Sequence, residues 1–407
     1  MRNINIIRLF FGAWITIQAI IIIYLGDIEQ MRDAYGYMNN ALFCYDNNCL
    51  APSIKECFSV YVQSPGYTNF LVIVYAIFHS FKAVMWLNLI MNSVVVYEIY
   101  WLGKHFYTKK VGVIASVLFA LMINNLFVPL HILSELPFLF IGLSGFLFVC
   151  KGRNFDIVIA SILFAIGYTI KPLIYAFFIP AIILLIIRKY NWKSYIAIFF
   201  PYIILLQLYG FKVQQETGVK VTSSTTGGFC LCMSAISPWA DYTVFQEGGF
   251  AYIEETQKLN VLQKDSIRKT KAIEIILNQP SIFIMNCLKK PFLLFKVDSW
   301  AFHTSTLEYL QEKLMEPKYN IVSKYFIRGF NHVFDFPYRI VMALFFVSLY
   351  FLQRNIFSEK GLLLLIAILG IGATCLFHVE YRYHYPYMFV FCIWAASLFE
   401  KTNKTTI

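Results

Sequence analysis

A group of carboxylates and small residues follows the first apolar segment, in a chain with only 23 Asp and Glu among its 407 residues. Asp33, Tyr37 and Ala41 are spaced i, i+4 and i+8, and Glu29 precedes Asp33 by four residues. On a helix these side chains share one face. A carboxylate held at the mouth of a membrane-embedded cavity is a candidate general base. We therefore predict that Asp33 is a base; the alternative is a solvated loop with an ordinary acidic cap.

A lysine inside an apolar stretch is the second candidate. Lys171 and Pro172 have about 14 apolar residues before them and about 15 after, so each arm is roughly 21 Å long, shorter than the ~30 Å hydrocarbon core. The turn is therefore expected below the membrane surface. An ammonium there costs roughly 2.5–3.5 kcal/mol when it faces lipid, so Lys171 should face a polar cavity or an anion. The alternative is a lysine that snorkels from a helix end.

Two further polar stretches lie beside predicted helix starts. HILSELP (131–137) places Glu135 where Ser134 and Pro137 favour a helix start, although a lone carboxylate there also suits the positive end of the helix dipole. HVEYRYHYPY (378–387) combines alternating charges with tyrosines. Arginine binds phosphate in a bidentate fork, and tyrosines can line a sugar site. An aromatic membrane belt would explain the tyrosines but not the charges.

A small, polar, glycine-rich stretch follows at 222–238, TSSTTGGFCLCMSAISP. Its two glycines would permit close approach of a ligand to the backbone, but they do not form a nucleotide-binding fingerprint. We expect a flexible loop here.

The composition requires a membrane protein. The chain is 59% hydrophobic, 18% aromatic and 14% charged, with a mean hydropathy of +0.62. The net charge of +11 comes from Lys and Arg in short gaps between apolar segments, for example at 104–110, 151–153 and 188–193. This positive-inside pattern indicates a cytoplasmic face and argues against a nucleic-acid partner.

The apolar segments predict an all-α integral membrane protein with both termini in the cytoplasm and about ten crossings. We predict a membrane bundle at 1–210 with a catalytic outer loop at 26–66 that carries amphipathic helices, an outer insert at 211–335, and C-terminal membrane helices at 336–407. Residues 65–78 and 281–300 are expected to lie at the interface. The predicted crossings are 9–25, 84–102, 111–128, 136–150, 157–170, 173–187, 195–209, 340–352, 362–377 and 386–399.

The nine cysteines show no metal spacing with histidine, so no zinc site is predicted. Cys44, Cys49 and Cys57 lie in the first outer loop, where an oxidising compartment would allow a disulfide among them. The first apolar segment has no small-residue cleavage site and is interpreted as a retained anchor.

Several motifs, in their order along the chain, resemble the type C glycosyltransferase superfamily. The branch that they resemble most contains protein O-mannosyltransferases, aminoarabinose transferases and their bacterial relatives. The residues that carry the resemblance are Asp33, Tyr37 and Ala41; Ser64, Pro65, Gly66 and Tyr67; Asn88; Ser134, Glu135 and Pro137; Thr226, Gly227 and Gly228; and Arg382, Tyr383 and Pro386.

The resemblance implies an inverting transfer of a sugar from a polyprenyl-phosphate donor to a glycan, lipid or protein acceptor, at the outer face of a bacterial plasma membrane. It implies Asp33 as the base and Lys171 and Arg382 as contacts of the donor phosphate. Many relatives have Glu after the Asp, whereas this chain has Ala34, which leaves a divalent metal an open question. The implied supporting or substrate-binding residues are Tyr37, Tyr67, His131, Glu135, Glu380 and Tyr383.

Two other functions are compatible with the composition. A transporter or flippase would predict inverted repeats and paired broken helices, which the sequence does not show. A polymerase or ligase of lipid-linked glycans would share the outer-face cavity without needing the Asp33 pattern. A lipid-linked donor already carries its activation, which agrees with the absence of a nucleotide-binding fingerprint.

Overall fold

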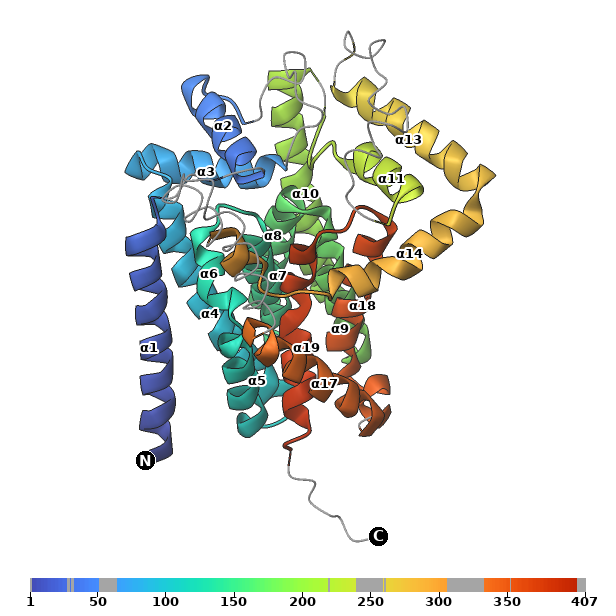
Figure 1. The fold of residues 1–407 in the computed structure, drawn as a ribbon. Coiled ribbons are helices and arrows are strands. Elements are labelled where there is room, and N and C mark those ends of the chain that lie inside the picture. The colour runs from blue at the N-terminus through green and yellow to red at the C-terminus, as the bar shows by residue number, and fades with distance from the viewer. Residues whose placement is uncertain are drawn as a thin grey trace, which may run out of the picture.

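The computed structural model describes residues 2–27, 30, 33–50, 64–218, 220–238, 259, 261–305, 333–351 and 353–400. Within these residues the protein is helical and contains no strand, which confirms the predicted all-α membrane class (Figure 1). Helix α1 (Arg2–Leu25) stands at the edge of a bundle. Helices α2 (Asp33–Asp46) and α3 (Pro65–Phe78) lie across the end of the bundle opposite the N-terminus.

The bundle itself is built from helices of different lengths that pack against one another (Figure 1). They are α4 (Lys82–Phe106), α5 (Lys109–Leu121), α7 (Glu135–Lys151), α8 (Asn154–Ile170), α9 (Tyr175–Ile187), α10 (Trp192–Thr217), α17 (Phe336–Phe351), α18 (Gly361–Leu376) and α19 (Met388–Ser397). Short elements join them: α6 (Asn124–Phe127) and the 3-10 turns η1 (Val128–Leu130), η2 (Pro172–Ile174), η3 (Gln353–Phe357) and η4 (Tyr381–Tyr387). Helices α11 (Gly227–Ile236), α13 (Val261–Asn278) and α14 (Pro280–Leu294) lie within the segment 211–335, which was predicted to be an outer insert.

Three of the described helices are long and apolar enough to cross a membrane alone: Ile6–Leu25, Lys82–Phe106 and Trp192–Glu216. A fourth is present if the bent pair Lys109–Leu121 and Asn124–Leu130 counts as one span, and several shorter apolar helices accompany them. The predicted total of about ten crossings therefore remains a prediction. The start of α1 and the end of α19 lie at the same end of the bundle (Figure 1).

The predicted crossing at 111–128 is not a straight helix, because the chain bends by 72° between α5 and α6. Backbone carbonyls freed by such a break must be satisfied inside the protein. Buried side-chain amides do this: Asn125 donates to Phe119 O at 2.5 Å, Asn92 to Asn125 O at 2.8 Å, and Asn88 to Pro129 O at 3.3 Å and His131 O at 3.0 Å. After the bend, α6 and η1 lead to the start of α7.

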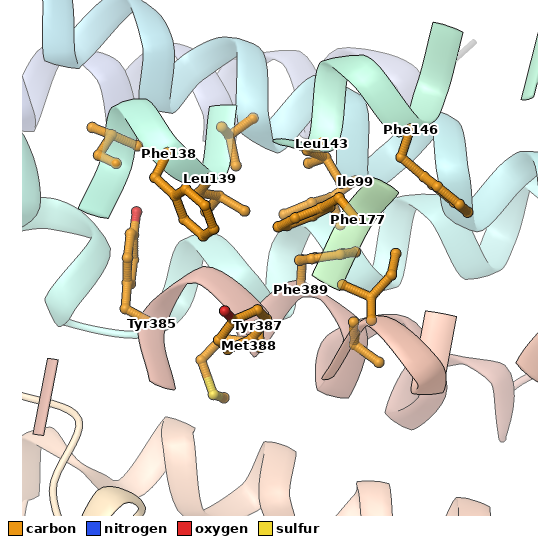
Figure 2. Packing of buried hydrophobic residues seen from close by; sticks show 14 of the residues in the cluster. Ile99, Phe138, Leu139, Leu143, Phe146, Phe177, Tyr385, Tyr387, Met388 and Phe389 are labelled. Carbon is orange, nitrogen blue, oxygen red and sulfur yellow. The ribbon is translucent and has the colours of Figure 1, made fainter. Parts of the chain in front are cut away.

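An aromatic core joins α7, α9 and α19 beneath that end (Figure 2). Phe177 stacks on Phe389, with ring centroids 6.1 Å apart, and meets the edge of Phe138 at 5.8 Å. A Cβ added at Gly142 would lie 2.7 Å from the Phe177 ring, so the glycine permits this close contact. Between lipid-embedded helices such van der Waals packing holds the elements together. Because η4 directly precedes α19, this aromatic packing also holds η4 beside the start of α7.

Other expectations are corrected by the structure. The stretch 222–238 is not simply a loop, because α11 forms within it and packs against α13. Helix α10 runs beyond the predicted 195–209 at both ends. Cys44 and Cys49 carry free thiols, and Cys57 lies outside the described residues, as does Glu29.

Candidate functional site

Helix α2 positions Asp33 at the end of the bundle. The helix begins at Asp33 and buries Tyr37 and Ala41, as their spacing predicts. The Tyr37 ring meets the Tyr67 ring edge-on at 4.8 Å, and its hydroxyl lies 3.4 Å from Ser134 Oγ. Helix α2 is therefore held against α3 and the start of α7, while the Asp33 side chain stays 31% exposed.

Gln30 connects the two segments that lead into α2 and α7. Its amide nitrogen donates to Leu130 O at 3.3 Å, and its amide oxygen accepts from Ile132 N at 3.2 Å. This two-point contact fixes the chain before Asp33 relative to the chain before Glu135. Sequence reasoning missed Gln30, because a single glutamine belongs to no recognisable motif.

Lys171 reaches the same end of the bundle from α8. The backbone becomes extended at Lys171 and Pro172 starts η2. The start of α3 packs so closely here that a Cβ at Gly66 would lie 2.0 Å from Thr169 Oγ1. The Lys171 ammonium donates to Glu135 Oε1 at 2.9 Å and lies 5.3 Å from the centre of the Tyr383 ring. The prediction that Lys171 faces an anion is confirmed, and the anion is Glu135.

Arg382, in η4, contacts three carboxylates. Its Nη2 pairs with Asp33 Oδ2, and its Nε lies 2.8 Å from Glu380 Oε2 and 3.5 Å from Glu135 Oε1. The guanidinium also lies 5.5 Å from the centre of the Tyr383 ring. Lys171 and Arg382 therefore meet at one carboxylate oxygen and over one aromatic ring, although they come from opposite halves of the sequence.

We refer to Asp33, Glu135, Lys171, Glu380 and Arg382 as the charged cluster. It contains three carboxylates and two cations. Burial alone would raise the pKa of Glu380, but the Arg382 guanidinium and the His378 imidazole outweigh it and lower that pKa to about 2. His378 Nε2 lies 3.2 Å from Glu380 Oε1. The second oxygen of Glu135 is buried and has no hydrogen-bond partner among the described residues.

The remaining predicted residues surround this cluster. His131 Nε2 lies 3.0 Å from Ala301 O and 2.9 Å from Ser305 Oγ, so its ring is turned toward residues 300–305 rather than into the ion pairs. Tyr67 packs against Tyr37, and Tyr383 lies against both cations. Ser134 and His378 also belong to the site; the sequence offered them only as neighbours of Glu135 and Glu380.

Helix α11 lies beside the cluster. Burial raises the pKa of the Cys230 thiol to about 12, and the nearby carboxylates of Glu380 and Asp33 add to this rise. The Thr226–Gly228 segment starts this helix. Gly228 N donates to Asp265 Oδ1 at 2.7 Å, and a Cβ at Gly228 would lie 2.2 Å from Asp265 O. The lack of a side chain at Gly228 therefore allows α11 to pack closely against α13.

The described residues contain no group of three or more His, Cys, Asp or Glu side chains placed to hold a metal ion. The cluster carboxylates face Lys171 and Arg382 instead.

The site therefore consists of a partly exposed carboxylate beside two cations, held across the end of a helical membrane bundle. No protein-family model and no curated protein matches the sequence. Among solved structures, the chain is similar to the archaeal oligosaccharyltransferase AglB from Archaeoglobus fulgidus in complex with an inhibitory peptide and a dolichol-phosphate. That match has 14% identity and a TM-score of 0.50, and covers 96% of this chain and 50% of that one.

The apo form of the Archaeoglobus fulgidus oligosaccharyltransferase gives a similar result, with 14% identity, a TM-score of 0.50, and coverage of 95% of this chain and 49% of that one. This chain thus spans about half the length of the oligosaccharyltransferases that it resembles. At this identity the similarity shows a shared fold, which extends over nearly the whole of this chain.

Proposed function

We propose that this protein is a type C glycosyltransferase that moves a sugar from a polyprenyl-phosphate donor to an acceptor at the non-cytoplasmic face. The observation that carries the proposal is the convergence of Lys171 and Arg382 on Glu135, beside Asp33. The shared fold supports it, because the neighbouring structures are oligosaccharyltransferases and one of them holds a dolichol-phosphate.

The two cations are suited to a leaving phosphate. Arginine and lysine donate charge-assisted hydrogen bonds to phosphate oxygens, and arginine does so in a planar fork. In the cluster both side chains are held by carboxylates and by the Tyr383 ring, so little ordering is required of them when a donor binds. A phosphate between Lys171 and Arg382 would share their N–H groups with Glu135 and Glu380.

Asp33 is the proposed base, because its partly exposed carboxylate lies beside Arg382. In the proposed step the acceptor oxygen bonds to the anomeric carbon while the bond from that carbon to the phosphate oxygen breaks, its electron pair leaving with the phosphate. Asp33 takes the acceptor proton, and the configuration at the anomeric carbon inverts. The Arg382 contact orients the Asp33 carboxylate, and the partial exposure of Asp33 leaves room for an acceptor.

The proposed orientation of the bundle rests on its charges. Lys104 lies in the last turn of α4, Lys109 starts α5 and Arg188 follows α9, all at the bundle end where α1 begins (Figure 1). Basic residues in short loops favour the cytoplasm. The charged cluster then faces the opposite compartment, where a lipid-linked sugar and an exported acceptor meet. The resemblance of the motifs to those of bacterial transferases is the basis for proposing a bacterial plasma membrane.

A transfer assay with matched variants tests the proposal. Protein reconstituted in lipid is supplied with radiolabelled polyprenyl-phosphate sugars and an envelope extract as acceptor. Asp33→Asn should lower transfer by about 10²–10⁴-fold, the usual contribution of a general base. Asp27→Asn is the control, because Asp27 is 80% exposed and forms an ion pair with Lys82 outside the charged cluster. Equal activity of the two variants would reject Asp33 as the base.

A comparison of cell-envelope glycans by mass spectrometry, with and without the gene, would identify the sugar and the acceptor. Loss of one envelope sugar is expected. An unchanged glycan profile together with altered export of another compound would favour a transporter.

A further inference from the structure

Helix α14 turns an apolar face outward. Ile284, Met285, Leu288 and Phe292 are exposed, Leu288 by 60% and Phe292 by 80%. A helix on the water-exposed surface of a globular protein has the opposite arrangement, with its polar residues outside. The outward face of α14 is therefore unsuited to water.

The inward face of the same helix is polar. Asn286, Lys290 and Leu294 are buried at i, i+4 and i+8. The Lys290 ammonium donates to Ser234 Oγ and, at 2.6 Å, to Phe377 O, while the Ser234 hydroxyl donates to Leu376 O at 2.8 Å. A cation at the C-terminal carbonyls of a helix stabilises that helix end. The hydrogen bonds of Lys290 therefore connect α14 to the C-terminal end of α18.

The chain that leaves α18 carries part of the charged cluster. Phe377 directly precedes the segment 378–382, which holds His378, Glu380 and Arg382. Glu380 lies three positions after Phe377, and Arg382 lies two positions further on, in η4. Because the intervening backbone is so short, the Lys290 contact with Phe377 O connects the position of α14 to the position of Arg382.

The apolar surface of α14 continues onto the bundle. On α18 the side chains of Ile368 and Leu376 are exposed, and Phe377 beyond its end is exposed as well. On α13, Ile273 and Leu277 are exposed in the last two turns before α14 begins. In Figure 1, α13 and α14 form a V whose point projects sideways from the bundle at the level of its outer end. Exposed apolar side chains therefore lie on α14 and on the adjoining parts of α13 and α18.

The charges around this surface suit lipid headgroups. Lys269, Lys271 and Lys289 are exposed on α13 and α14, and Glu274 is an exposed carboxylate among them. Basic residues beside the apolar face of an interfacial helix attract anionic lipid headgroups. At 15 residues, with Lys289 and Lys290 within it, α14 is too short and too charged to cross the bilayer.

We propose that α14 lies within the bilayer leaflet on the side of the charged cluster, with its apolar face against the acyl chains, and holds the segment 378–382 at headgroup depth through Lys290. Lipid is the occupant of the exposed face. The further statement that this depth suits a lipid-linked phosphate rests on the proposed function. The location of α14 in the leaflet is independent of the proposed function.

Collision measurements on spin labels test the location. Labels are placed at Leu288→Cys and Phe292→Cys, and at the control Thr270→Cys on an exposed polar part of α13, in protein with its native cysteines replaced and reconstituted in vesicles with anionic lipid. Oxygen should collide with the labels at 288 and 292 several-fold more often than a water-soluble nickel chelate does, and the label at 270 should show the reverse. Nickel accessibility at 288 and 292 equal to that at 270 would overturn the proposal.

A second pair of variants perturbs the two surfaces directly. Leu288→Glu introduces a charge on the lipid-facing surface, whereas Thr270→Glu introduces one on the polar surface. Leu288→Glu should move the label at 292 toward water, and Thr270→Glu should leave it in place; equal effects of the two would count against the proposal. If the wild-type protein showed lipid-exposed labels but no glycosyl transfer, the location would stand and the proposed function would fail.

Discussion

Removing either cation of the charged cluster should weaken use of the donor, but not equally. Lys171 contacts one carboxylate of the cluster, Glu135, whereas Arg382 contacts Glu135, Glu380 and Asp33. Lys171→Met removes one phosphate contact and should lower kcat/KM for the donor at least tenfold, about 1.4 kcal/mol. Arg382→Met also releases Asp33 from its partner and leaves three carboxylates with one cation. We expect a loss of about a hundredfold or more, roughly 2.7 kcal/mol.

A double variant tests whether the two cations act together. Because both act on one group, their effects should not multiply, and the double variant should lose less than the product of the single losses. Lys171→Arg should retain more activity than Lys171→Met, because it keeps a positive charge that can donate a charge-assisted hydrogen bond to a phosphate oxygen. Lys82→Met is the control, because Lys82 forms an exposed ion pair with Asp27 away from the cluster.

The assay measures initial rates of sugar transfer in lipid nanodiscs at varied donor concentration. The elution volume of each variant in size-exclusion chromatography in detergent is the check that it is folded. Activity of Lys171→Met within about twofold of wild type would refute the assignment of that lysine, since even one lost phosphate contact should cost tenfold. Fully multiplicative losses in the double variant would show that the two cations act on different groups.

Three further predictions concern stability and orientation. Gly66→Ala should destabilise the protein by about 1–3 kcal/mol, measured by thermal unfolding in detergent, because its Cβ would lie 2.0 Å from Thr169 Oγ1; an unchanged midpoint would contradict the packing. The pKa of Glu380 is lowered from 4.5 to about 2, so its contribution to stability, at most about 3 kcal/mol, is present above pH 4.5 and is lost as the pH falls toward 2. Glu380→Gln should reduce this pH dependence, and an identical acid-unfolding profile would exclude the proposed pairing. In intact cells an impermeant maleimide should label Thr270→Cys but not Lys193→Cys, and the reverse result would invert the orientation.

Local patterns were predictable from the sequence. The i, i+4, i+8 spacing of Asp33, Tyr37 and Ala41 predicted a helix with one buried face, because that relation depends only on helix geometry. The bounds of α3 agree with the predicted segment 65–78 for a similar reason, since Pro65 starts the helix and its apolar run ends at Phe78. The all-α membrane class followed from composition alone.

Contacts between distant residues were not predictable in the same way. A lysine in an apolar stretch predicts a polar cavity or an anion, but its local sequence could not single out Glu135, which lies 36 residues away on another helix. The pairing of Arg382 with Asp33 joins residues 349 positions apart. The sequence grouped these residues only through resemblance to a family, and their mutual contacts come from tertiary packing.

The errors have physical causes as well. The bend within 111–128 was not predicted, because Asn124 and Asn125 are only two polar residues in an otherwise apolar stretch. The amide of Asn92, from α4, contributes to the bend there. The stretch 222–238 looks like a loop because of its glycines, but Asp265 from α13 accepts from Gly228 N and stabilises the start of α11. In both cases a side chain from another helix overrides the local preference.

The central claim is that the charged cluster binds the phosphate of a lipid-linked sugar. A cryo-electron microscopy structure with a non-transferable polyprenyl-phosphonate sugar tests it most directly. We predict that the phosphonate oxygens lie within hydrogen-bond distance of Lys171 Nζ and the Arg382 guanidinium, with the anomeric carbon facing Asp33. A phosphonate bound elsewhere in the bundle, with Lys171 and Arg382 still paired only to their carboxylates, would contradict the claim.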